Sequence, residues 1–223
     1  MAVRVGDTAR ARRLIDLVLP VKKKIYGDLH HSTGYAYSVL GFVLRREGKL
    51  AEARAIHQKE VTNKRGYGDD RSWSAEGLDG LAAVALTEKR PLEAIAHLEQ
   101  ARTVLEKAKA DRSHRSRLVP ILSHLGRAYM AAGRTSEAVI VLRRAIELAA
   151  ANGSSGARGG ARAKFELARA TWSSGDRAEA IDLARSALDV LSAGEESKHL
   201  DWVSDQGELA TIRDWLRRHQ PLE

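Results

Sequence analysis

The amino-acid sequence predicts an all-α fold in which antiparallel helix pairs stack along one axis. The first observation is a short phrase, "GRTSEA" at residues 133–138, which recurs in similar form along the chain. The second is a pair of leucine and a small residue at a fixed distance before the end of each phrase. The third is the three- and four-residue spacing of apolar residues around each pair, which is typical of amphipathic helices. Because one helix pair cannot bury its own apolar face, such units are expected to stack.

The recurring phrase has a nearly constant period. Its final alanine returns after 42, 41, 44 and 42 residues, and in four units a small residue precedes that alanine by 12 positions. The alanines are Ala11, Ala53, Ala94, Ala138 and Ala180, and the pairs are Leu40-Gly41, Leu81-Ala82, Leu125-Gly126 and Leu167-Ala168. We expect the small residues to lie where the two helices of a unit cross, so that a larger side chain would overpack the crossing.

The turn inside each unit is marked by glycine. Gly48, Gly133 and Gly175 stand where the first helix must stop, and a left-handed backbone there costs glycine little. The second full unit departs from this pattern, since it has the stretch 89–91, "KRP", in place of a glycine.

We predict one array over residues 1–223. Residues 1–28 are expected to form a half repeat with a second helix only, because the 12-residue interval before Ala11 reaches beyond the first residue. The edge without a preceding helix is either exposed, paired with another chain or completed by upstream sequence. We favour the last interpretation, in which this is the tail of a longer architecture or a truncated gene. The four full repeats are predicted at residues 29–69, 70–112, 113–153 and 154–196.

Residues 197–223 are predicted to form a C-terminal capping helix. The pair Leu209-Ala210 follows the fourth Leu–small pair by 42 residues, and Trp215 is expected on the inner side, with Arg217 and Arg218 outside. The glycine-rich stretch 152–164 is expected to be a flexible connection between the third and fourth repeats.

These features resemble the tetratricopeptide repeat. The resemblance rests on the Leu–small pairs, a large residue near the end of the first helix (Leu44, Tyr129), the turn glycine and the interval to the alanine. The period of about 42 residues, against the usual unit of about 34, resembles the kinesin-light-chain-like class. The segments "YGDLHHSTGYAYS" at 26 and "YGDDRSWSAEGLD" at 67 align at an offset of 41. The resemblance implies a right-handed superhelical solenoid.

In this family the first helices line a concave groove that holds a partner peptide, and its positions can be carried over by their distance from each Leu–small pair. The predicted partner-binding residues are Ser38, Phe42, Arg45, Asp79, Ala83, Leu86, Ser123, Arg127, Met130, Phe165, Arg169 and Trp172. Arg127 and Arg169, one repeat apart, are expected to grip an acidic segment. The alternatives are that the aromatic residues pack in the core and that the arginines are solvated.

A second resemblance is to the C-terminal regions of large bacterial serine/threonine protein kinases, notably those of myxobacteria. It rests on the Arg/Ala-rich texture of residues 26–219 and on the order of "AKFELARATWSSGDRAEAIDLARSAL" and "ELATIRDWLRRHQ". The chain has no Gly-rich phosphate loop, His-Arg-Asp loop or Asp-Phe-Gly motif. The resemblance therefore implies a signalling array rather than a catalytic domain.

Composition limits the function further. The chain has 223 residues, no cysteine and a formal net charge of +8. Residues 1–26 carry seven Lys/Arg against two acidic residues and residues 112–150 carry seven Arg against two, whereas residues 67–111 are net acidic. No signal peptide or membrane-spanning run is present, so we predict a cytoplasmic protein. Basic charge leaves open an Arg-rich solenoid that binds nucleic acid, but we favour an acidic protein or peptide partner.

No catalytic, cofactor or metal site is predicted. His30 and His31 are adjacent in a loop and point apart, whereas metal ligands must converge. Residues 152–164 lack the spacing of a phosphate-binding loop, although an anion at the following helix N-terminus stays open. No nucleophile or acid–base pair can be argued, so we predict a non-enzymatic protein that needs no cofactor.

Overall fold

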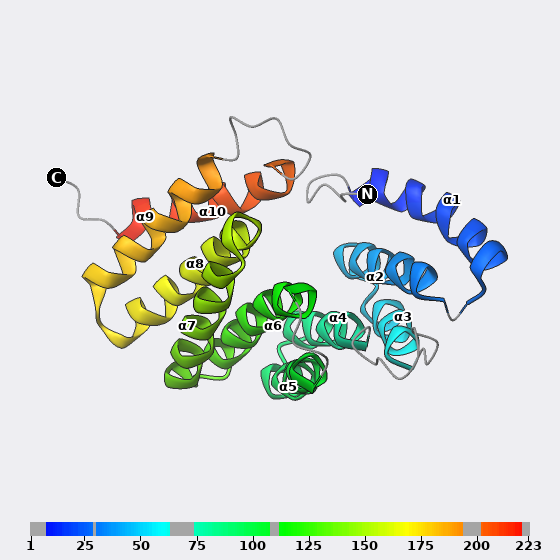
Figure 1. The fold of residues 1–223 in the computed structure, drawn as a ribbon, viewed down its shortest axis with the longest axis horizontal. Helices are drawn as coiled ribbons and strands as arrows, with labels where there is room; N and C mark the ends of the chain where they lie inside the picture. The colour runs from blue at the N-terminus through cyan, green and yellow to red at the C-terminus, as the bar shows by residue number, and fades with distance from the viewer. Residues whose placement is uncertain (1–7, 29, 63–73, 108–111, 194–201, 220–223) are drawn as a thin grey trace. The chain divides into compact units, whose positions relative to one another are not determined.

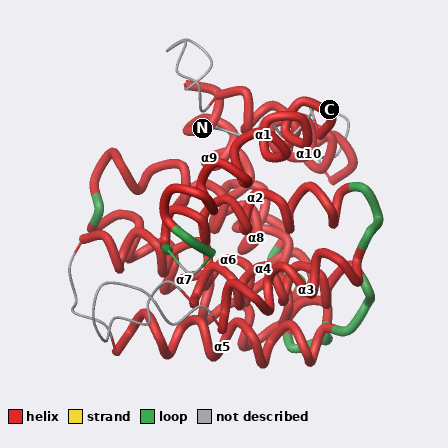
Figure 2. Tube along the Cα trace, turned by 90° about the vertical axis from the view of Figure 1, so that its right-hand side faces the viewer, coloured by secondary structure: helices red, strands yellow, loops and turns green. Residues whose placement is uncertain are grey.

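The computed structural model describes residues 8–28, 30–62, 74–107, 112–193 and 202–219. Within these ranges the chain forms helices α1 to α10 and one 3₁₀ turn, η2, and it contains no strand. Figure 2 shows helices joined by short loops. The prediction of an all-α solenoid of antiparallel helix pairs is therefore confirmed.

The first compact unit comprises residues 7–110 and is called the N-terminal unit. Its helices are α1 (Thr8–Tyr26), α2 (His31–Arg46), α3 (Leu50–Thr62), α4 (Ser74–Thr87) and α5 (Pro91–Lys107). Each helix packs against the next one along the chain, and α2 also contacts α4. The first helices of two consecutive pairs therefore lie side by side, as stacking of repeats requires.

The second compact unit, the C-terminal unit, is described over residues 112–193 and 202–219. Its elements are α6 (Arg112–Ala131), α7 (Thr135–Ala151), η2 (Gly153–Gly156), α8 (Ala157–Ser174), α9 (Arg177–Ala193) and α10 (Trp202–His219). Successive helices pack in order, and α6 also contacts α8 (Figure 1). Each predicted full repeat contains one helix pair, although α6 begins one residue before the predicted boundary. The continuity of one array over residues 1–223 stays a prediction.

The turn between paired helices contains a residue with a positive φ in all four full repeats. Gly48, Gly133 and Gly175 have φ values of 79°, 74° and 100°, and Lys89 has a φ of 59° at the corresponding turn of the second repeat. The amide of the residue after Lys89 donates to the carbonyl oxygen of Ala85 at 2.8 Å, as in a Schellman cap. The second repeat therefore keeps the turn without the glycine, and Lys89 adopts a conformation that side chains disfavour.

The phrase alanines lie in the core, as predicted. Ala53, Ala94, Ala138 and Ala180 are completely buried. At the crossing of α6 and α7, a Cβ atom added to Gly126 would lie 2.5 Å from Cγ of Leu142. The small residue of the pair therefore sets how closely the partner helix can approach.

The prediction of a flexible connection over residues 152–164 is wrong for most of that stretch. Only the segment up to Gly156 connects the helices, and residues 157–164 form the first turns of α8. The glycines serve packing there, because a Cβ atom on Gly159 would lie 3.0 Å from Val119 and one on Gly160 would lie 3.0 Å from Ala149. Glycine-rich sequence was interpreted as a loop, whereas here it permits close helix contacts.

Helix α10 packs against α9 in the C-terminal unit. Trp215 is buried in a cluster that α8, α9 and α10 share, and Arg217 and Arg218 are exposed. The ring of Trp215 contacts those of Phe165 and Trp172 edge to face, with centroids 6.0 and 5.6 Å apart. The predicted inward position of Trp215 is confirmed.

Candidate partner-binding site

The surface carried by the first helices of the pairs (α2, α4, α6, α8 and α10) is called the A-helix face, and it is described separately in each unit. Helical periodicity puts residues three before, one after and four after the small residue of each Leu–small pair on one side of the helix. All twelve predicted partner-binding residues occupy these positions.

On α2 the predicted residues are half-buried and engaged with neighbours. The guanidinium carbon of Arg45 lies 5.5 Å from the ring centroid of Phe42, within cation–π range. The hydroxyl of Ser38 donates a hydrogen bond to the carboxylate of Glu60 in α3. Two of the three α2 residues thus form an ordered aromatic–cationic pair that is still partly accessible.

On α4 the three predicted residues are also half-buried. Asp79 is the only acidic one of the twelve predicted residues, while Ala83 and Leu86 are apolar. This part of the A-helix face is therefore mixed in character, and it offers no cluster of cations to an acidic ligand.

The C-terminal unit concentrates positive charge on the same face. Nε of Arg127 in α6 lies 3.4 Å from one carboxylate oxygen of Glu166, and Nη1 of Arg169 lies 3.0 Å from the other. Both arginine side chains are about half exposed, whereas Glu166 is mostly buried. The structure thus brings together the two arginines that the sequence singled out, and it inserts a carboxylate between them.

Three other predicted residues turn inward. The hydroxyl of Ser123 is buried and donates to the carbonyl oxygen of Val119 at 2.9 Å. Phe165 is buried in the cluster with Trp215, and Trp172 packs against Trp215 and against His219, whose ring centroid is 4.5 Å away. The alternative that the aromatic residues pack in the core therefore describes Phe165 and Trp172 of α8. The remaining predicted residue, Met130 of α6, is half-buried.

Sequence reasoning missed several residues of the A-helix face. Tyr35 of α2 is exposed, and Nε of Arg162 in α8 lies 2.7 Å from the carboxylate of Glu208 in α10. Tyr35 and Arg162 both lie six residues before the small residue of their pair, and Glu166 and Glu208 both lie two before. Extending the predicted side of the helix by one turn would have found Tyr35 and Arg162, and widening it by one neighbouring row would have found Glu166 and Glu208.

A buried polar group also escaped the sequence interpretation. His57 of α3 is buried, and a Cβ atom added to Gly41 or Gly80 would lie within 2.5 Å of its ring. Its Nδ1 lies 3.3 Å from the buried carboxylate of Glu60, which also accepts the hydrogen bond from Ser38. The carboxylate of Glu60 lies between the hydroxyl of Ser38 and the imidazole of His57. A serine nucleophile is activated by an imidazole next to its hydroxyl, so the three residues do not form a catalytic triad. The group instead joins α2, α3 and α4.

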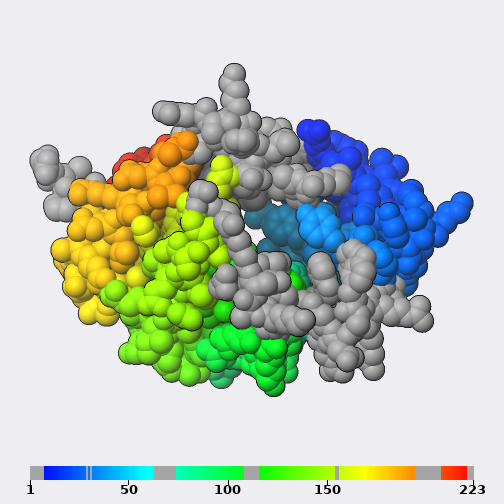
Figure 3. Space-filling model, viewed as in Figure 1, coloured from blue at the N-terminus to red at the C-terminus, as the bar shows by residue number. Residues whose placement is uncertain are grey.

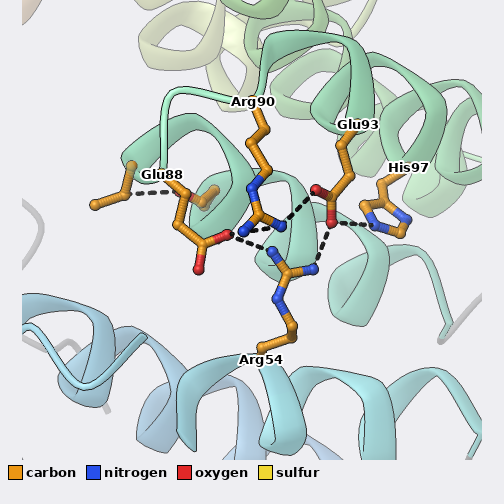
Figure 4. A network of polar contacts seen from close by, with 7 residues as sticks. Arg54, Glu88, Arg90, Glu93 and His97 are labelled. Carbon is orange, nitrogen blue, oxygen red and sulfur yellow. Dashed lines mark hydrogen bonds and ion pairs between the residues drawn. The ribbon is translucent and has the colours of Figure 1, made fainter. Parts of the chain in front are cut away.

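A second polar group links consecutive repeats in the N-terminal unit. Figure 4 shows Arg54 of α3 between Glu88, which follows α4, and Glu93 of α5. Its two terminal nitrogens each lie 2.5 Å from one of these carboxylates. The hydrogen bond from Arg54 lowers the pKa of Glu93, while burial lowers the pKa of His97 more than the Glu93 carboxylate raises it. The arrangement is an inter-repeat clamp rather than an acid–base site.

Metal-ligand and membrane features were also sought in the described ranges. There, no group of three or more His, Cys, Asp or Glu side chains is placed to hold a metal ion. None of the helices in those ranges combines the length and hydropathy that spanning a bilayer requires.

Comparison with known proteins agrees with the helix-pair architecture. A family model described as tetratricopeptide repeat matches residues 36–107 and 118–193, about two thirds of the chain. Comparison with curated protein sequences gives no significant match.

Several solved structures share the fold at low identity. One holds nearly identical TPR-like repeats of a kinesin light chain from Podosopora anserina, with 24% identity, a TM-score of 0.61, and coverage of 86% of this chain and 90% of that one. BtubC (BKLC) from P. vanneervenii has 13% identity, a TM-score of 0.66, and coverage of 100% and 96%. The yeast histone chaperone Hif1 has 15% identity, a TM-score of 0.55, and coverage of 84% and 94%.

Proposed function

Because the chain belongs to the tetratricopeptide repeat family, we propose that it is a non-catalytic protein–protein interaction module. In this proposal the A-helix face of the C-terminal unit binds an acidic segment of a partner protein. Arg127 and Arg169 are the principal contacts, and Phe42 and Arg45 provide a second, aromatic–cationic contact in the N-terminal unit.

The observation that carries the proposal is the sharing of one carboxylate by two half-exposed guanidinium groups. A guanidinium group has five N–H donors, whereas a carboxylate has about four acceptor positions. Glu166 therefore cannot satisfy both arginines, and each guanidinium group keeps N–H donors that a further carboxylate can use. Charge-assisted hydrogen bonds between guanidinium and carboxylate groups are among the stronger polar contacts that proteins form.

We also propose a biological role for the module, in signalling. The resemblance of residues 26–219 to the C-terminal arrays of bacterial serine/threonine kinases supports a regulatory or scaffolding role in the cytoplasm, beside a kinase domain. Hif1 is described as a scaffold protein that recruits protein complexes to core histones. A scaffolding role of this general kind is compatible with the helical-repeat fold.

The proposal can be tested with a labelled glutamate-rich peptide of about 12 residues and fluorescence anisotropy. The wild-type protein should bind this peptide, and Arg127→Glu/Arg169→Glu should weaken binding at least ten-fold, because two charge-assisted contacts become repulsive. A matched control is Arg144→Glu/Arg185→Glu, which makes the same change in net charge on the second helices α7 and α9. Equal affinity in both double variants would contradict the proposal.

The same binding assay, with a labelled nucleic acid in place of the peptide, tests the alternative that the protein binds nucleic acid. A labelled DNA or RNA duplex that binds more tightly than the acidic peptide, with an affinity that falls steeply with salt, would favour that alternative. A pull-down from cell extract with the wild-type protein and both double variants would then identify which natural partners depend on the two arginines.

A further inference from the structure

Helix α1 carries an exposed apolar row on the side that does not pack against the rest of the N-terminal unit. Leu17, Val21 and Ile25 are 70%, 55% and 64% exposed, and they recur every fourth residue. They therefore lie on one side of the helix and extend over about 12 Å. Figure 3 shows α1, in dark blue, with its surface open on the viewed side.

The opposite side of α1 is already used. Ala11 and Ile15 are buried, and α1 packs against α2. The helix therefore has two apolar sides, of which the fold covers one. An amphipathic surface helix normally has a polar outer side, so the second apolar side needs an explanation.

Comparison with the other second helices shows that the leucine of this row is particular to α1. Six residues after the phrase alanine, α1 has Leu17, whereas the other four second helices have polar residues at that position. They are Lys59, Gln100, Arg144 and Ser186. Ten residues after the alanine an apolar residue recurs in four of the five second helices (Val21, Val104, Leu148 and Val190). Leu148 of α7 is only 8% exposed, so Val21 stands exposed at a position that packing covers in α7. The outward leucine is therefore a feature of the sequence of α1 and does not follow from the repeat pattern.

Basic side chains border the apolar row. Arg13 lies one turn before Leu17, and Lys24 lies one turn after Val21 on the same side; both are exposed. Over residues 8–26 the helix has six Lys/Arg and a single acidic residue, Asp16. An apolar row with cations at both ends fits the complementary arrangement of an acidic amphipathic helix.

We propose that the exposed side of α1 docks an amphipathic helix of a partner protein, with leucine-like side chains on Leu17, Val21 and Ile25 and with Asp or Glu beside Arg13 and Lys24. This interface is separate from the A-helix face. A second copy of α1 is disfavoured as occupant, because it would bring six more cations against the first six. Residues 8–26 contain one exposed interfacial aromatic residue, Tyr26, and no Trp or Phe, so an anionic membrane surface is the competing occupant that the vesicle measurement below tests.

The test uses the full chain and two synthetic helical peptides of about 18 residues, identical in their leucine positions, with either Glu or Lys at the flanking positions. The wild-type protein should bind the Glu peptide at least ten-fold more tightly than the Lys peptide in isothermal titration calorimetry. Leu17→Gln/Ile25→Gln should weaken binding of the Glu peptide at least ten-fold, and Arg13→Glu/Lys24→Glu should reverse the preference between the peptides.

The matched control is Leu92→Gln/Ile140→Gln, which replaces two side chains that are each 68% exposed on α5 and α7. This control should leave the affinity unchanged. The loss of affinity caused by Leu17→Gln/Ile25→Gln should be the same in the Arg127→Glu/Arg169→Glu background, which separates the α1 interface from the A-helix face. Circular dichroism should show the same helical signal in all variants, because the replaced side chains are exposed.

Four results would overturn the proposal. The first two are that the wild-type protein does not bind the Glu peptide, and that Leu92→Gln/Ile140→Gln loses as much affinity as Leu17→Gln/Ile25→Gln. The third is binding to anionic vesicles that requires Leu17 and Ile25. The fourth is self-association of the wild-type chain, seen by light scattering, that Leu17→Gln/Ile25→Gln abolishes. The last two would assign the row to a membrane surface or to a second copy of the chain.

Discussion

Replacing Gly126 with alanine tests whether the absence of a side chain sets the distance between paired helices. The new Cβ atom would lie 2.5 Å from Cγ of Leu142 and 2.7 and 2.8 Å from its two methyl carbons. Leu142 is completely buried, so its displacement must disturb the core. Overpacking of this kind costs about 1–3 kcal/mol. Alanine in a helix interior gains about 1 kcal/mol over glycine, so we expect a net loss of about 1 kcal/mol in the free energy of unfolding.

A matched control is available in the same unit. A Cβ atom added to Gly207 of α10 meets no other atom within 4 Å. Gly207→Ala should therefore raise the free energy of unfolding by up to about 1 kcal/mol, because only the higher helix propensity of alanine acts there. Urea unfolding followed by far-ultraviolet circular dichroism should thus move the two variants in opposite directions from the wild-type protein.

The reasoning also predicts a specific coupling. Leu142→Val should cost less in the Gly126→Ala background than in the wild-type protein, with an interaction free energy of at least about 0.5 kcal/mol. If Gly126→Ala is as stable as Gly207→Ala, or if the two substitutions at Gly126 and Leu142 are additive, the close approach at the crossing does not determine the packing.

Three further predictions concern single residues. Lys89→Gly should raise the free energy of unfolding, measured with urea, by about 0.5–1 kcal/mol. A left-handed backbone costs a residue with a side chain about 1–2 kcal/mol, and the greater chain entropy of glycine in the unfolded state offsets part of the gain. A lower free energy of unfolding would contradict a strained turn at Lys89. Hydrogen bonds from Lys59 and Tyr37 lower the pKa of Asp28 to about 2, so its stabilisation should be complete above pH ~4 and disappear as the pH falls toward 2. The difference in stability between the wild-type protein and Asp28→Asn should shrink over that range, and a constant difference would rule out the ion pair as its cause. Arg54→Ala should lower the free energy of unfolding by about 1 kcal/mol at low salt and by less at high salt, since two partly buried carboxylates lose their shared partner. A loss that does not depend on salt would show that Arg54 stabilises the protein through packing instead of charge.

Most of the fold could be predicted from spacing. The interval from the Leu–small pair to the alanine fixed which residues face each other across a helix pair, and the completely buried Ala138 follows from it. The turn at Lys89 shows that the helix-pair geometry holds even where the glycine signal is absent. The stretch 157–164 was not predictable in the same way, because glycine is used both for loops and for close helix contacts, and only the neighbouring atoms distinguish the two uses.

The candidate site was predictable in position but not in its contacts. Helical periodicity placed Arg127 and Arg169 on one side of α6 and α8, since that depends on the backbone alone. The carboxylate of Glu166 between them depends on how the side chains of two repeats meet, and spacing does not determine that. Phe165 lies in the core because Trp215 of α10 packs on it, a contact between residues far apart in the sequence.

The most direct test of the proposed function removes the internal carboxylate that the two arginines share. If Arg127 and Arg169 bind an acidic segment, Glu166→Gln should tighten binding of the glutamate-rich peptide by about three- to ten-fold, because the partner carboxylate no longer competes with Glu166. Glu179→Gln makes the same change in net charge on α9 and should leave the affinity unchanged. Unchanged or weaker binding in Glu166→Gln would show that the arginines only hold the repeats together and do not bind a partner.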